Sequence, residues 1–412
     1  MKPPRFNPLT FSPFNPDSFY GWRMVWVLAI STTVAYGVLY YSFAVFVQPM
    51  EQELGWNRAQ TSAAFSLAML VAGLFAPFLG RVLDKHGARA VMSLGALGSS
   101  GLLLLWSVTP SLPLLYATWF GLGLCAAATF YDPAFTAVAV WFKQHRARAM
   151  LTITLVAGLA STIFVPLDTW LLETLGWRSA VRVLALLSLL TVPLLWLVLR
   201  RHPADIGSSV DGLPEQAKPE AQAVVSTINF WHSKIFWSVA LAFALARTAV
   251  SVLAVHLVPL LRERGYSSLF AASVAASIGV LQLVGRVFFT SLTARAALII
   301  LSSLTFLVHG IGILFLTSAT DVGVWGFVLF YGATNGAITL TRAALLGELF
   351  ASSIYGRVNG LVSLFSALSG ALMPFFAGVL HNQTGDYQLV LWLLVGTLAI
   401  SSGLVLGARG RS

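Results

Sequence analysis

Charged side chains are scarce in this sequence. Of its 412 residues only 10% are Asp, Glu, Lys or Arg, whereas 57% are hydrophobic. Soluble domains average about 25% charged and about 45–50% apolar residues. A water-soluble fold could not remove so much apolar surface from water, because much of any folded surface stays wet. The composition therefore excludes a typical soluble protein and a disordered chain, and it indicates that lipid surrounds most of the molecule.

The sequence is also poor in groups that bind metals and cofactors or act as nucleophiles. Its single cysteine, Cys125, excludes an intrachain disulfide and a cysteine-based metal site. It contains no HExxH helix motif, no phosphate-binding Walker loop and no paired carboxylates. The glycines at 121 and 123 follow no predicted strand, so they indicate close helix packing rather than a dinucleotide site. We therefore expect neither enzymatic activity nor a bound cofactor or metal.

Long apolar runs fill most of the chain. A helix that crosses a bilayer needs about 20 mostly apolar residues, and such runs occur six times on each side of a polar gap. They cover 23–47, 59–80, 90–108, 112–141, 148–172, 180–199, 235–258, 269–292, 296–316, 322–347, 357–380 and 387–407. They predict an all-α integral membrane protein with twelve transmembrane helices. Its predicted parts are the tail 1–22, the bundle 23–199, the linker 200–234, the bundle 235–407 and the tail 408–412.

Basic residues are distributed unevenly between the two sides of these spans. If both termini lie on one side, seventeen of the 25 Lys and Arg fall on that side and five on the other. Because basic loops mark the cytoplasmic side, we expect both termini and the linker 200–234 to be cytoplasmic. The net charge of +10 has the same origin and does not indicate nucleic-acid binding. The first twenty residues lack the pattern of a cleaved signal peptide.

The two halves of the chain repeat one another at an offset of 210 residues. The segment 47–56 aligns with 257–266, and Trp177 aligns with Tyr387. A parallel repeat around an axis along the membrane normal is typical of transporters whose site lies between the halves near mid-membrane.

The loop after the second run reads GRVLDKHGAR, from Gly80 to Arg89. Gly80 and Gly87 allow close approach and a tight turn. Asp84, followed by Lys85, is expected to accept hydrogen bonds from a helix end or a cationic side chain and so to latch this side of the molecule. The loop resembles the signature Gly-x-x-x-Asp-Arg/Lys-x-Gly-x-Arg of the major facilitator superfamily. This resemblance covers nearly the whole chain and implies the major facilitator fold and transport by alternating access.

Other strings resemble the monocarboxylate transporter family and its bacterial relatives. They are Gly21-Trp22-Arg23, Tyr36-Gly37, Ser42-Phe43-Ala44-Val45-Phe46, Gly55-Trp56-Asn57-Arg58, Trp141-Phe142-Lys143, Arg146-Ala147-Arg148-Ala149 and Arg286. Two positions depart from the animal members, because Gln282 replaces an Asp and Tyr40 or Tyr41 replaces a Lys. The proton-linked lactate mechanism therefore does not transfer intact. The run 157–166 also lacks the Gly-Pro-rich motif of drug/proton antiporters.

Asp132 and Arg342 place charge inside predicted spans, where it is costly and marks function. They are 210 residues apart, on the fourth and tenth spans, which face each other across the central cavity in the superfamily that the chain resembles. We expect the two to pair, directly or through water or substrate. Pairing favours the carboxylate and isolation favours its protonated form, so Asp132 is a candidate for proton coupling; a structural ion pair is the alternative. Pro133 is expected to kink this span.

Three arginines inside the spans, Arg247, Arg286 and Arg342, outnumber the one deep acid. A guanidinium binds a carboxylate through two parallel hydrogen bonds, so the excess predicts an anionic substrate. The alternative is that Arg247 or Arg286 only staples helices. The other candidate substrate residues are polar side chains on the spans expected to line the cavity: Tyr36, Tyr131, Gln282, Tyr331 and Asn335.

His256, near the outer end of the seventh span, is a second candidate for proton coupling or gating. His309 lies on a span that is expected to face away from the cavity. Asp168, near the outer end of the fifth span, is expected to cap a helix or to pair with Arg178 or Arg182.

The leading hypothesis is a secondary transporter in the cell membrane that moves a small organic anion, a monocarboxylate in the first instance, with proton coupling. Its expected partners are this anion, protons and membrane lipid, and the resemblance implies a monomer. The alternative is an exporter of amphipathic or drug-like compounds with the same fold.

Overall fold

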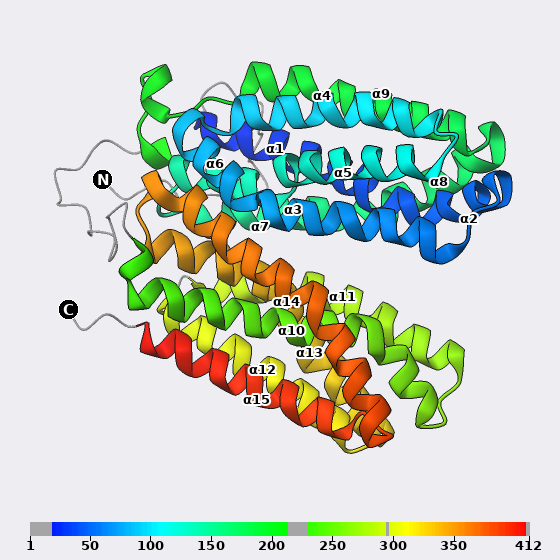
Figure 1. The fold of residues 1–412 in the computed structure, drawn as a ribbon. Coiled ribbons are helices and arrows are strands. Elements are labelled where there is room, and N and C mark those ends of the chain that lie inside the picture. The colour runs from blue at the N-terminus through cyan, green and yellow to red at the C-terminus, as the bar shows by residue number, and fades with distance from the viewer. Residues whose placement is uncertain (1–18, 213–229, 294–295, 409–412) are drawn as a thin grey trace.

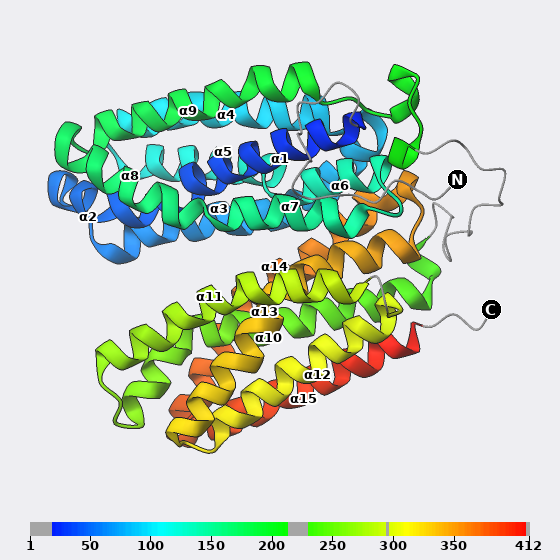
Figure 2. The ribbon, with the colours of Figure 1, turned by 180° about the vertical axis from the view of Figure 1, so that it is seen from behind.

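The computed structural model describes residues 19–212, 230–293 and 296–408. Within these residues the chain is helical and contains no strand (Figure 1). The helices α1–α9 form one bundle and α10–α15 form a second bundle beside it, as the views from both sides agree (Figures 1 and 2). Most of the predicted N-terminal tail, the middle of the predicted linker and most of the C-terminal tail lie outside the described residues.

The first bundle and the described part of the linker contain ten helices and three short 3-10 turns. They are α1 (Tyr20–Tyr36), the π-helical segment η1 (Gly37–Tyr41), α2 (Ser42–Leu54), α3 (Arg58–His86), α4 (Ala88–Ser107), α5 (Leu112–Thr129), α6 (Tyr131–Trp141), α7 (Arg146–Gly158), α8 (Ala160–Leu175), α9 (Trp177–Val198), η2 (Pro203–Ile206), η3 (Val210–Gly212) and η4 (Phe230–His232). The second bundle contains α10 (Lys234–Glu263), α11 (Ser268–Thr293), α12 (Leu298–Thr317), α13 (Asp321–Leu349), η5 (Ser352–Ile354), α14 (Tyr355–Thr384) and α15 (Gln388–Gly407).

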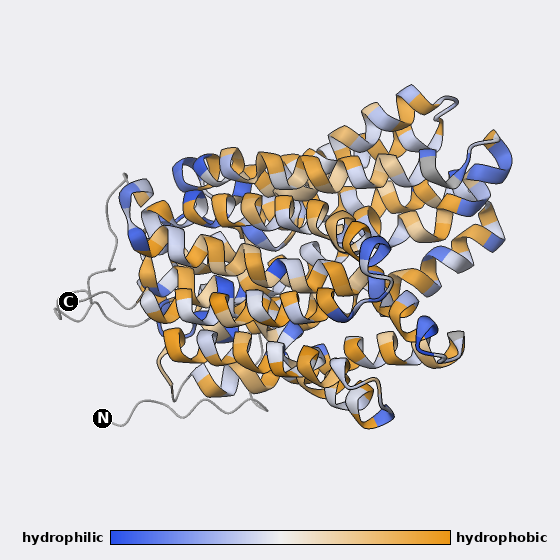
Figure 3. Cartoon of the chain, turned by 60° about the horizontal axis from the view of Figure 1, so that its bottom comes forward, coloured by the Kyte–Doolittle hydropathy of each residue, from blue (hydrophilic) through white to orange (hydrophobic). Residues whose placement is uncertain are grey.

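Eleven helical stretches of the described residues are long and apolar enough to cross a membrane. Hydrophobic residues cover the length of the helices, and hydrophilic ones gather at the two ends of the molecule (Figure 3). The remaining predicted span, 322–347, corresponds to α13, which has 29 residues. Its apolar run is interrupted by Asn335 and Arg342, which lower its hydropathy. The break predicted between 269–292 and 296–316 is confirmed, because α11 and α12 are separate helices.

Three of the predicted spans change conformation midway. Phe130 adopts an extended backbone and separates α5 from α6. The predicted kink at Pro133 is thus a complete break: Pro133 is the third residue of α6, where a missing N–H group leaves no intrahelical bond unmade. The sequence predicts neither the break at Leu159 between α7 and α8 nor the π-helical segment η1, since no proline lies at either place.

The repeat in the sequence has a structural counterpart at the end of the first membrane span of each half. Gly55 follows α2 with a φ of 70°, and Gly265, 210 residues later, follows α10 with a φ of 88°. Positive φ is strained for residues with a Cβ atom, so a glycine is favoured at both places. The two halves therefore share a turn as well as a sequence pattern.

The halves are in contact at one end of the molecule, which we call the linker end. It contains the start of α1, the linker residues 200–212 and the end of α15, and the bundles diverge toward the opposite, open end (Figures 1 and 2). α3 and α14 cross here through glycines: a Cβ atom on Gly80 would lie 2.0 Å from the carbonyl oxygen of Gly356, and one on Gly360 would lie 2.3 Å from that of Ala76. The backbones of the two halves thus touch directly.

Candidate functional site

A cavity of about 360 Å³ lies between the two bundles. Helices α1, α3, α5 and α6 line it from the first half, and α10, α13 and α14 line it from the second. It contains six of the residues that the sequence singles out for substrate binding or proton coupling: Tyr36, Tyr131, Asp132, Arg247, Asn335 and Arg342.

Asp132 and Arg342 form the expected ion pair, and it joins the two halves. Arg342 Nη2 donates to Asp132 Oδ1 at 2.7 Å, and Ser363 Oγ donates to Asp132 Oδ2 at 2.6 Å. Both charged side chains remain accessible, with 27% of Asp132 and 17% of Arg342 exposed. The break at Phe130 places Asp132 in the first turn of α6, where the helix dipole stabilises negative charge.

Arg247 brings a further positive charge to the cavity. It lies on α10, its side chain is exposed, and it makes no ion pair or hydrogen bond with any residue that the structure describes. Asp132, the one acid that lines this cavity among the described residues, is already engaged by Arg342. The cavity therefore presents one guanidinium that a bound anion could neutralise.

Two cavity residues on α14 were not among the predicted candidates. Ser363 bridges Asp132 and Arg342, while Asn359 is buried and its Oδ1 atom lacks a hydrogen-bond partner. Both are polar residues inside the predicted span 357–380, so the rule that selected Asn335 would also have found them.

The structure does not bring four of the predicted residues to the cavity. Arg286 Nη1 donates to the carbonyl oxygen of Thr154 in the other half at 2.6 Å, so here it acts as a helix staple. Tyr331 is buried and stacks on His309 with ring centroids 4.3 Å apart. The remaining two are Gln282, whose backbone packs on Gly336, and His256, which lies nearer the open end.

The signature loop contacts the second half at the linker end, where Asp84 accepts hydrogen bonds from a helix end and a cationic side chain. Asp84 accepts hydrogen bonds from the backbone N–H groups of Gly356 at 2.7 Å and Arg357 at 3.0 Å. The Arg357 side chain donates to the same carboxylate at 3.2 Å. Asp84 of the first half thus stabilises the N-terminus of α14 in the second half.

A second contact at the linker end involves Arg146, the first residue of α7. Its Nη1 group donates to the carbonyl oxygen of Gly347 near the end of α13. Of the other loop residues, Lys85 is exposed, Gly87 has a φ of 77°, and the Arg89 guanidinium lies 4.4 Å from the Trp196 ring centroid.

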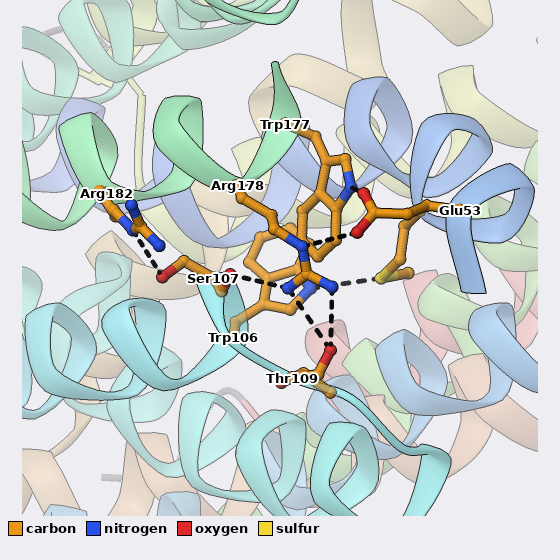
Figure 4. A network of polar contacts seen from close by, with 8 residues as sticks. Glu53, Trp106, Ser107, Thr109, Trp177, Arg178 and Arg182 are labelled. Carbon is orange, nitrogen blue, oxygen red and sulfur yellow. Dashed lines mark hydrogen bonds and ion pairs between the residues drawn. The ribbon is translucent and has the colours of Figure 1, made fainter. Parts of the chain in front are cut away.

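A polar network ties the first bundle together at the open end (Figure 4). Glu53 accepts from Trp177 Nε1 at 2.5 Å and from Arg178 Nε at 2.8 Å. Arg178 also donates to the carbonyl oxygens of Ser107 and Thr109. The network therefore joins the end of α2, the loop after α4 and the start of α9.

The expected pairing of Asp168 with Arg178 or Arg182 is wrong. Arg178 binds Glu53 instead, and Arg182 Nε donates to Ser107 Oγ at 3.3 Å. Asp168 is fully buried, and neither of its carboxyl oxygens has a hydrogen-bond partner among the described residues. It lies between Phe164 and Leu171 on the buried face of α8.

The second bundle has polar contacts at the equivalent positions, and one of them corresponds to a contact of the first network. Glu263, Tyr387, Gln388 and Thr317 stand 210 residues after Glu53, Trp177, Arg178 and Ser107. Here the Gln388 amide donates to the carbonyl oxygen of Thr317 at 3.4 Å, and Glu263 pairs with His381 at 3.1 Å. Tyr387 bonds His256 at 3.0 Å, and burial raises the pKa of Tyr387, with the charge of Glu263 adding to the effect.

Comparison with known proteins places these features in a family. The sequence model of the Major Facilitator Superfamily matches residues 28–341. Monocarboxylate transporter 13 of Bos taurus is 28% identical over 395 residues, which cover 95% of this chain and 90% of the relative. An uncharacterized transporter of the same superfamily from Bacillus subtilis, YcxA, is 22% identical and covers 92% of this chain and 94% of its own length.

Solved structures resemble the fold. FucP, a superfamily transporter solved in the outward conformation, superimposes with a TM-score of 0.73 at 15% sequence identity, over 93% of this chain and 98% of FucP.

Proposed function

The chain belongs to the major facilitator superfamily of membrane transporters, and from this premise we propose that it carries a small organic anion, a monocarboxylate in the first instance. One observation carries the proposal: Arg247 is exposed in the cavity between the halves and has no ion-pair partner among the described residues. The names of the relatives that match most of the chain point to the same class of substrate.

The charge balance of the cavity favours an anion with a single negative charge. The charges of Asp132 and Arg342 cancel each other, which leaves the guanidinium of Arg247. A guanidinium fits a carboxylate through two parallel hydrogen bonds, and burial from water strengthens both. Asn335 lines the same cavity and supplies an amide that orients the substrate.

Proton coupling is proposed to act through the ion pair. An anion that draws Arg342 toward itself leaves Asp132 with fewer donors, and the carboxyl group then binds a proton more readily. When the anion leaves, Arg342 returns and the proton is released. Asp132 is exposed enough to exchange its proton with the cavity.

In the proposed mechanism of alternating access, the contacts between the two halves at the linker end break and re-form. Two contacts must break when the cavity opens at that end. Asp84 must leave the start of α14, and Arg146 must leave the end of α13. The proposal therefore describes a cycle in which these contacts break while the diverging ends approach each other.

Reconstituted liposomes test the substrate and its coupling. Arg247→Gln should abolish carboxylate uptake, whereas Arg262→Gln, on the same helix but outside the cavity, should leave it unchanged. Asp132→Asn should lose uptake driven by a proton gradient and keep counterflow exchange, which needs no net proton movement. Transport of cationic dyes in place of carboxylates would support the alternative, an exporter of amphipathic compounds. Full proton-driven accumulation by Asp132→Asn would make this acid a structural ion-pair residue.

We also propose that the linker end faces the cytoplasm of the cell, because most basic residues lie at this end. Single cysteines in a Cys125→Ala background test the orientation at Ala204 in the linker and at Ser318 after α12, both exposed. In intact cells an impermeant thiol reagent should label Ser318→Cys and leave Ala204→Cys unlabelled. The reverse labelling pattern would invert the topology.

A further inference from the structure

Aromatic rings from the first half form one wall of the central cavity. Phe130 stacks on Tyr36, with ring centroids 4.1 Å apart and planes 10° from parallel, and Tyr131 lies 4.9 Å from Tyr36. All three line the cavity. Phe130 reaches it because the chain leaves the helical conformation there, between α5 and α6. The break that positions Asp132 thus also places an aromatic ring beside it.

The wall formed by the middle of α3 and α14 is flat. It is made of glycine and alanine on α3 and α14: Ala72, Gly73, Ala76, Gly360 and Ala367. The helices approach so closely that a Cβ atom on Gly73 would lie 2.2 Å from the Cβ of Ala367. Leu79 and Leu83 of α3 also line the cavity but lie farther along the helix, nearer the linker end, so a planar group can lie against the glycines and alanines of this wall. A cavity of about 360 Å³ is near the lower limit of ligand pockets, which span about 300–1,000 Å³.

The charged groups restrict what else the ligand carries. Arg247 attracts a carboxylate, and on α10 it lies one turn after Phe243, another cavity residue. An ammonium group would find no free acid among the described lining residues, because Asp132 already accepts from Arg342 and Ser363. It would also be repelled by Arg247.

We propose that the preferred substrate is a monocarboxylate with a single aromatic ring and no ammonium group, bound with its carboxylate on Arg247 and its ring between the aromatic wall and the flat wall. This inference rests on the proposed function. It specifies the part of the substrate that carries the carboxylate, in addition to the charge. An aromatic ring gains free energy of binding from stacking and from apolar burial. A short aliphatic acid has no ring and gains neither to the same extent.

Binding to the purified protein tests the proposal with three probes: phenylacetate, acetate and L-phenylalanine. Phenylacetate should bind at least about tenfold more tightly than either of the other two. Phe130→Leu should weaken phenylacetate binding by about fivefold and leave acetate binding within about twofold. Phe130→Tyr, which keeps the ring, should retain the preference. Phe120→Leu, which removes an exposed ring of α5 outside the cavity, serves as the matched control.

The outcomes separate this inference from the proposed function. Equal affinity for phenylacetate and acetate, with both lost in Arg247→Gln, would overturn the aromatic preference and leave the anion site intact. Tight binding of L-phenylalanine would overturn the exclusion of an ammonium group. If no carboxylate bound or crossed the membrane, the proposed function itself would fail.

Discussion

Asp132 and Arg342 each depend on the other for charge compensation inside the membrane. Changing one of them to a neutral residue strands the other charge in a setting of low dielectric. We expect Asp132→Asn or Arg342→Gln alone to lower the free energy of unfolding by about 2 kcal/mol, below the value for a fully buried pair because both side chains keep some exposure.

The double variant Asp132→Asn/Arg342→Gln should lose clearly less stability than the sum of the two single changes. Thermal and denaturant unfolding in detergent measure this coupling. Strictly additive losses would mean that the two charges do not interact in solution.

Sequence patterns can identify the partners of the ion pair but not every cavity residue. Asp132 and Arg342 are found because both are charged, lie within spans and stand 210 residues apart. Tyr331 lies on α13 with Asn335 and Arg342, yet α12 approaches it so closely at Gly312 that its ring packs on His309. Arg286 is equally charged but is captured by a backbone carbonyl of the other half. Such competition depends on packing, which a single sequence does not encode visibly.

At the scale of helices, the two open-end networks differ in the cation that pairs with their glutamate. Arg178 is always charged, and it forms an ion pair with Glu53 at 2.8 Å. His381 lies 3.1 Å from Glu263 and makes an ion pair only when its ring is protonated. The first bundle therefore has a permanent ion pair at its open end, and the second bundle has a single histidine contact in its place.

Matched substitutions test this difference. Glu53→Gln should lower the unfolding free energy by about 1 kcal/mol. Glu263→Gln should cost less, about 0.5 kcal/mol or below, because Glu263 makes one contact with His381 whereas Glu53 binds both Trp177 and Arg178. Denaturant unfolding of both variants beside the wild type gives the comparison. An equal cost for the two substitutions would contradict this difference between the networks.

The sequence predicts the helices of this fold better than their interruptions. Apolar runs locate the spans because each must satisfy its backbone internally while facing lipid. The break at Phe130 is signalled by Pro133, whose ring disfavours a continuous helix because it lacks an N–H group and crowds the preceding turn. The break at Leu159 and the π-helical segment η1 carry no such mark. Both lie where helices of the bundle pack against one another, so we attribute them to tertiary packing.

At the scale of the whole molecule, we expect the glycine contact between α3 and α14 to determine which end of the cavity is closed. A methyl group at Gly80 would collide with the carbonyl oxygen of Gly356, a backbone atom that cannot rotate away. Gly80→Ala should therefore disfavour closure at the linker end by at least about tenfold in population. Gly101→Ala on α4, where an added Cβ atom meets nothing within 4 Å, is the control.

Spin labels at Glu173 and Asn382, exposed residues near the open ends of α8 and α14, report the change. The distance between them should shorten in Gly80→Ala and stay at the wild-type value in Gly101→Ala. Unchanged distances in both variants would show that the α3–α14 crossing does not control closure.

The proposed cycle also determines how transport responds to membrane voltage. With Asp132 and Arg342 cancelling each other, the described lining residues of the empty cavity carry one positive charge, that of Arg247. If one monoanion and one proton on Asp132 enter together, as proposed, their charges cancel and the loaded cavity carries the same charge as the empty one. Moving one elementary charge through about 100 mV changes the free energy by about 2.3 kcal/mol. The outward and return movements would then meet equal and opposite electrical work, and the pH gradient would drive accumulation without a contribution from voltage.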